Sequence, residues 1–128
     1  MAAFLSAEWL ELQPQLAADL PERPGASARM QIVVTGTPEG EVAYVQQIED
    51  GRLTAASLGR DDAADVTLTQ THADAVAIAR GDLDANAAFM QGRVKVTGNM
   101  GSLMALMPLT QSAEYQTFLA GLAEQTEF

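Results

Sequence analysis

Hydrophobic and polar residues alternate along three stretches of the chain, Glu41–Glu49, Asp65–Thr71 and Arg93–Thr97. A period of two residues is that of a β-strand with one buried face. Two further stretches have strand composition. Met30–Thr35 is rich in β-branched residues and nearly all apolar, as a central strand is, and Leu53–Leu58 follows a turn signal. The pattern therefore predicts five strands.

The turn signal is the pair Asp50-Gly51, which is typical of a two-residue type I′ hairpin. It predicts that the strand Glu41–Glu49 turns back into Leu53–Leu58. The strands place Thr or charged residues on one side, so we expect a sheet with one solvated face and one face covered by helices. Along Glu41–Glu49 the alternation puts Val42, Tyr44, Gln46 and Ile48 on one face and Ala43, Val45 and Gln47 on the other.

Helices are predicted where apolar residues recur every three or four positions. The first follows Ser6, which we expect to be its N-cap, and Pro14 should kink or split it near Gln13. Its apolar face is formed by Trp9, Leu12, Leu16 and Leu20.

Further helices are predicted after Thr71 and Asp84, both expected N-caps, with Gly81 and Gly92 just past the helix ends. A methionine-rich helix begins at Met100, and Pro108 should stop it. The last helix begins near Ser112, with Tyr115, Phe118, Leu119 and Leu122 on one face. The expected fold class is α+β.

Composition narrows the functional classes. A chain of 128 residues predicts one domain, residues 1–128. Its 17 acidic and 7 basic residues give a net charge of −10, which disfavours nucleic-acid binding and contact with anionic membranes. It contains no cysteine, no signal-type N-terminus and no apolar run near 18 residues, so we expect a cytoplasmic protein.

The sequence offers little for catalysis, metal binding or a cofactor. His72 is the only histidine, and no serine lies in a nucleophile-elbow motif. Asp82-x-Asp84-x-Asn86 opens like a calcium loop but lacks the later glycine and glutamate. We therefore expect a protein that is not an enzyme and has no catalytic residues, metal ligands or cofactor.

Methionines gather in the second half of the chain, at positions 90, 100, 104 and 107. Methionine fills irregular apolar space and is common on surfaces that accept varied ligands. From the residues alone, such a cluster is typical of an ordinary core, and a ligand site is the alternative.

The segment GDLDANAAFMQGRVKVTGNMG, Gly81–Gly101, resembles the signature of the sterol carrier protein-2 domain family, and Ala64–Thr69 fits the family too. The resemblance spans residues 1–128 and indicates a bacterial stand-alone member, because the last residues are not a peroxisomal Ser-Lys-Leu signal. It implies a five-stranded, mostly antiparallel sheet of order 3-2-1-4-5 with helices on one face.

The resemblance also implies non-catalytic binding or carriage of a long apolar ligand, such as a fatty acid, fatty acyl-CoA or sterol-like lipid, in a hydrophobic tunnel between sheet and helices. The alternatives are a protein-interaction or homodimerisation module that uses the same groove, and an accessory domain of an enzyme. We expect the last helix to act as a lid. The candidate lipid-binding residues are Val66, Leu68, Val76, Phe89, Met90, Met100, Leu103, Met104, Met107, Tyr115, Phe118, Leu119 and Leu122.

Overall fold

The computed structural model describes residues 2–128, and the side chains at positions 19 and 86 are not considered. Seven strands, five α-helices and one 3₁₀ turn follow one another along this part of the chain. In order they are β1 Ala2–Ala3, α1 Ala7–Leu16, the 3₁₀ turn η1 Ala17–Asp19, β2 Ala28–Thr37, β3 Gly40–Glu49, β4 Arg52–Leu58, β5 Val66–Thr71, α2 His72–Arg80, α3 Ala85–Met90, β6 Lys95–Gly98, α4 Met100–Thr110, α5 Ala113–Glu124 and β7 Thr126–Glu127.

Five of the strands form one sheet in the order β4-β3-β2-β5-β6. Neighbours are antiparallel except β2 and β5, which run parallel and are connected through β3, β4 and the β4–β5 loop. The predicted α+β class and strand order are confirmed. In register, Ile32 lies opposite both Tyr44 and Leu68, so these three side chains share one face.

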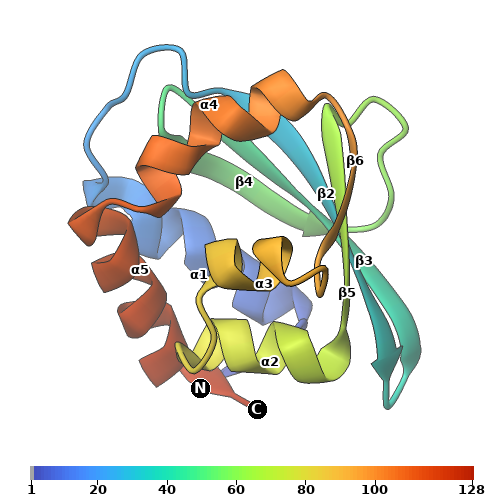
Figure 1. The fold of residues 1–128 in the computed structure, drawn as a ribbon. Coiled ribbons are helices and arrows are strands. Elements are labelled where there is room, and N and C mark those ends of the chain that lie inside the picture. The colour runs from blue at the N-terminus through green and yellow to red at the C-terminus, as the bar shows by residue number, and fades with distance from the viewer. Residues whose placement is uncertain (1) are drawn as a thin grey trace.

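The helices gather on that face of the sheet (Figure 1). The hydrophobic core lies between the two layers and joins strand residues to residues of α1, α4 and α5. Its largest fully buried apolar side chains are Leu10, Val34, Val66, Leu106 and Leu109.

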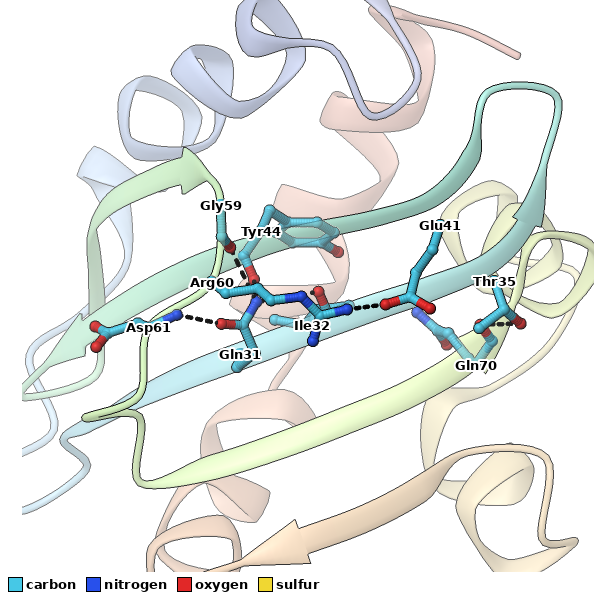
Figure 2. A network of polar contacts seen from close by, with 9 residues as sticks. All are labelled: Gln31, Ile32, Thr35, Glu41, Tyr44, Gly59, Arg60, Asp61 and Gln70. Carbon is cyan, nitrogen blue, oxygen red and sulfur yellow. Dashed lines mark hydrogen bonds and ion pairs between the residues drawn. The ribbon is translucent and has the colours of Figure 1, made fainter.

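The opposite face of the sheet carries a polar network centred on Gln31, which is only 4% exposed (Figure 2). Its Nε2 donates to the carbonyls of Tyr44 at 2.9 Å and Gly59 at 3.1 Å, and its Oε1 accepts from the amide of Asp61 at 2.6 Å. Arg60 forms an ion pair with Glu41 beside it. One buried side chain thus ties the β4–β5 loop to the centre of the sheet.

The expected N-caps at Ser6, Thr71 and Asp84 are confirmed, and Ser112 is a further N-cap. Side-chain oxygens of Ser6, Thr71, Asp84 and Ser112 each accept a hydrogen bond from the amide three residues later. Gly81 closes α2 in the left-handed conformation, with φ of 85°. The hairpin pair Asp50 and Gly51 both have positive φ, 51° and 84°, as a type I′ turn requires.

The predicted helix breaks at the two prolines were wrong. Pro14 does not split α1, which runs to Leu16, and Pro108 does not stop α4, which runs to Thr110. A proline in a helix removes one backbone hydrogen bond. Buried neighbours hold the helix in each case: Gln13 in α1, and Leu106 and Leu109 in α4.

The last strand of the sheet also differs from the prediction, because β6 begins at Lys95 rather than Arg93 and ends at Gly98. The Arg93 amide donates to the carbonyl of Ala88, which keeps it in the turn after α3. Gly98 has φ of 105°, and a Cβ there would lie 2.6 Å from the carbonyl oxygen of Asp65. The close approach of two backbones therefore requires glycine at this position.

The sequence patterns did not reveal a second, two-stranded sheet. β1 and β7 pair in parallel, with Ala2 opposite Thr126 and Ala3 opposite Glu127. This pairing brings the two ends of the described chain side by side (Figure 1). Two residues per strand are too few for a period to be recognised.

Candidate functional site

A cavity of about 450 Å³ lies between the helix-covered face of the sheet and the helices. That volume is within the range of roughly 300–1,000 Å³ that is usual for small-molecule sites. Its walls are mostly apolar. The sheet contributes Met30, Ile32, Tyr44, Leu68 and Val96, and the helices contribute side chains from α1 to α5.

Ten of the thirteen candidate lipid-binding residues line this cavity. α4 supplies four of them and α5 supplies another four, which is why the two helices form its main wall. The ten are Leu68, Phe89, Met100, Leu103, Met104, Met107, Tyr115, Phe118, Leu119 and Leu122.

The other three candidates lie elsewhere. Val66 packs within the hydrophobic core and is 1% exposed. Val76 is on α2 but off the face that lines the cavity, which carries Ala75, Ile78 and Ala79 at helical spacing. Met90 is the last residue of α3 and is 83% exposed, because that short helix turns its buried side, at Ala88, toward the core.

The sequence patterns did not assign the half of the cavity formed by α1, β2 and β3. Trp9 and Gln13 of α1, with Tyr44 and Gln46 of β3, line it. The alternation in Glu41–Glu49 groups Tyr44 and Gln46 on one face, but it does not say that this face is turned toward the helices. What was missing was the position of α1 over the β4 and β3 side of the sheet.

α5 is held at its C-terminal end rather than free to swing. Phe118 and Leu122 are each 6% exposed. Beyond the helix, the Trp9 indole Nε1 donates to Thr126 Oγ1 at 3.1 Å, and β7 pairs with β1. These contacts favour α5 as a wall of the cavity over the expected lid.

Burial controls the electrostatics of the cavity. It raises the pKa of Tyr44 well above the ordinary value, and the neighbouring Tyr115 adds to this shift. Burial also raises the pKa of Tyr115. Both hydroxyls therefore stay protonated at physiological pH and serve as hydrogen-bonding groups rather than as acids or bases.

Other chemistry has little support in the described part of the chain. No group of three His, Cys, Asp or Glu residues within residues 2–128 could hold a metal ion. The half-buried His72 lies beside Phe4, with ring centroids 6.0 Å apart. Asp84, the candidate calcium-loop residue, caps α3 instead. None of the helices in residues 2–128 has the length and apolar character needed to span a membrane.

The fold that encloses the cavity has clear counterparts among known proteins. A family model described as the SCP-2 sterol transfer family matches residues 9–111. The chain belongs to this family. Membership supports binding or transfer of an apolar lipid in general terms and does not name the ligand.

Individual relatives agree with this assignment. Sterol carrier protein 2 of Gallus gallus is 35% identical over 69 residues, which are 54% of this chain and only 12% of that protein. A crystal structure of sterol carrier protein 2 has a TM-score of 0.70 at 19% identity and covers 97% of this chain and 99% of that chain. The palmitated SCP2L2 of Aedes aegypti has a TM-score of 0.65 at 18% identity, with coverage of 88% and 96% respectively. At such identities the structures establish the fold alone.

Proposed function

We propose that residues 1–128 act as one lipid-binding domain that holds and carries a long apolar ligand without catalysing a reaction on it. The observation that carries the proposal is the cavity of about 450 Å³ with its largely apolar walls. The similar Aedes aegypti protein, which is described as palmitated, makes a fatty acyl chain one reasonable occupant. Fatty acids, fatty acyl-CoA and sterol-like lipids are the ligand classes we consider.

The driving force would be desolvation of the ligand. Burying some fifteen methylenes at about 0.8 kcal/mol each gives a gross gain of roughly 12 kcal/mol. Association and ordering of the ligand oppose this by several kcal/mol. The net affinity should then lie between micromolar and nanomolar. A cytoplasmic location remains an expectation from composition.

The test uses two adjacent residues of α3 that differ in their relation to the cavity. Phe89 lines it, whereas Met90 points outward and is 83% exposed. Phe89→Asp should weaken binding of a fluorescent fatty acid at least roughly tenfold, since a carboxylate would enter the apolar wall. Met90→Asp, which adds the same charge one residue away, should bind like the unchanged protein.

Folding of both variants is checked by circular dichroism. Equal affinity of the two folded variants would contradict the proposal. Native mass spectrometry of freshly purified protein adds a direct measurement, because a carrier should retain lipid from the expression host.

A dimerisation module is the second candidate, favoured by exposed apolar side chains beside the cavity. Met100 is 44% exposed and Met104 is 60% exposed, and both line the cavity. A second copy could cover them. Sedimentation velocity over a range of concentrations separates the two functions, because Met104→Asp should weaken a dimer but leave a monomeric carrier monomeric.

A further inference from the structure

The two outer strands of the five-stranded sheet differ in how well they are protected against pairing with another chain. β6 is only four residues long, carries Lys95 and ends at Gly98, whose φ is 105°. Short length, charge and irregular backbone are the usual features that keep an edge strand from pairing. β4, in contrast, is seven residues long and has no charged residue or proline after Arg52. It is therefore the open edge of the sheet.

The backbone of β4 presents hydrogen-bonding groups along this edge. In an antiparallel pair, alternate residues turn their amide and carbonyl toward the partner strand. The Gly59 amide donates to the carbonyl of Ala43 at 2.9 Å, so the alternation turns Leu58 and Ala56 away from β3. Within residues 2–128, no backbone–backbone hydrogen bond joins β4 to a segment other than β3. The outward amides and carbonyls are thus available to a further strand.

The side chains of β4 give the two faces of this edge different character. Leu58 lies opposite Tyr44, on the helix-covered face, and is 49% exposed. Ser57 lies opposite Val45 and lines a polar pocket of about 330 Å³ on the open face of the sheet. Arg60 lines the same pocket and lies over that face (Figure 2). A strand added beside β4 would meet an apolar side chain on one face and polar ones on the other.

Charge selects the kind of chain that suits this edge. Residues 51–60 include Arg52 and Arg60 and no acidic residue, although the whole chain has a net charge of −10. Antiparallel pairing with a second copy about Ala56 would set Arg52 against Arg60 and bring two acidic chains together, which is unfavourable. Arg60 forms an ion pair with Glu41, but its exposed guanidinium has further N–H donors. An acidic chain therefore complements this edge better than a second copy does.

We propose that β4 binds an extended segment of a partner protein, which pairs antiparallel with β4 and alternates acidic with apolar residues. Its apolar side chains pack beside Leu58, and its acidic side chains lie on the open face toward Arg60. Main-chain hydrogen bonds supply the affinity, and the alternation of side chains sets the register. The surface is separate from the lipid cavity, so the inference does not depend on the proposed lipid-binding function.

The test uses the fluorescein-labelled peptide Glu-Val-Glu-Val-Glu-Val-Glu-Val, whose binding is followed by fluorescence anisotropy at low ionic strength. In the proposed register the valines lie opposite Ala56 and Leu58, so the valine amides donate to β4. Methylation of the valine amide nitrogens should weaken binding at least roughly tenfold, whereas methylation of the glutamate amide nitrogens should change it less than about twofold. A peptide with lysine in place of glutamate should bind at least roughly tenfold more weakly.

Variants of the protein test the charge and the backbone separately. Arg60→Gln should weaken binding of the Glu-Val peptide roughly fivefold, near the upper limit for an exposed ion pair. Arg93→Gln is the matched control, because Arg93 is also exposed and ion-paired, to Asp74 at 3.9 Å, but lies beside β6. It should leave binding unchanged.

Ala56→Pro removes one outward amide at a position where an edge strand tolerates proline. This variant should keep its circular dichroism and lose at least roughly tenfold in affinity for the Glu-Val peptide. Should it unfold, the methylated peptides test the same hydrogen bonds on the unchanged protein.

The outcomes separate this inference from the proposed function. Failure of the unchanged protein to bind the Glu-Val peptide, or equal binding of the two methylated peptides, would overturn the inference. Displacement of a bound fluorescent fatty acid by the peptide would place the peptide in the cavity and likewise contradict it. A dimer in sedimentation velocity that Ala56→Pro converts to a monomer would show that a second copy occupies the edge instead. Peptide binding without fatty-acid binding would contradict only the lipid-binding function.

Discussion

The buried hydrogen bond between Trp9 and Thr126 offers a direct test of how the cavity wall is held. Thr126→Val keeps the shape of the side chain and removes the oxygen that accepts from the indole at 3.1 Å. The carbonyl of Leu122, which Thr126 also bonds, keeps its bond from the Gln125 amide. The substitution therefore leaves the indole N–H of Trp9 without a partner, and Trp9 is only 4% exposed.

The cost follows from that single donor. A buried donor left unpartnered costs about 1–3 kcal/mol. A chain of this length has a total stability of roughly 6–19 kcal/mol, so the loss is a measurable fraction. One kcal/mol shifts the Tm of a domain of this size by roughly 4 °C, which predicts a fall of about 4–12 °C.

Urea denaturation followed by tryptophan fluorescence gives the free energy of unfolding, and Trp9 is the only tryptophan in the chain. Thr117→Val is the matched control, because Thr117 is exposed on α5 and its hydroxyl bonds only the carbonyl of Ala113. The control should change stability by less than about 0.5 kcal/mol. A loss in Thr126→Val no larger than that of the control would refute the argument that this bond secures the wall.

Three further predictions concern the backbone, the polar network and the last helix. Gly98→Ala should lower the Tm more than Gly92→Ala. Both glycines have positive φ, but only a Cβ at position 98 would clash with backbone, at the carbonyl oxygen of Asp65. Equal losses of Tm in the two variants would contradict this. Gln31→Leu should speed hydrogen exchange at the Asp61 amide and cost about 2 kcal/mol, and unchanged exchange would show that the β4–β5 loop is held by other contacts. A chain of residues 1–109 should lose its far-ultraviolet circular dichroism, because α5 contributes to the core; a folded truncated chain would restore the lid interpretation.

Local sequence signals predicted most elements of the fold because each has a short-range cause. Thr71 and Ser112 cap helices through oxygens that reach an amide three residues away. Asp50-Gly51 forms the hairpin because both residues tolerate positive φ. The predicted helix breaks at the prolines were wrong because a helix break is not decided by local sequence alone. Whether a helix continues through Pro14 depends on the tertiary burial of its neighbours, which no short window contains.

Only part of the candidate site was predicted, because only part of it depends on local sequence patterns. The periodicity of α4 and α5, together with the family resemblance, indicated residues such as Leu103 and Phe118 that line the cavity. Met90 belongs to the same methionine cluster in sequence, yet it points to solvent, because one step along a helix turns the side chain by about 100°. Gln13 joins the cavity only through the packing of α1 against β3 and β4.

The segment that carries the family resemblance lines only part of the cavity, and the cavity residue Tyr44 lies outside it. Gly81, Gly92 and Gly98 lie in the segment and all have positive φ, so the backbone path itself requires them. Tyr44 has no such constraint, because replacing its phenol hydroxyl with hydrogen breaks no hydrogen bond among the described residues and leaves the strand intact. A fold can thus keep its turns while a polar side chain of its cavity changes. It follows that the turn glycines and the polar lining at Tyr44 answer to different demands on the sequence.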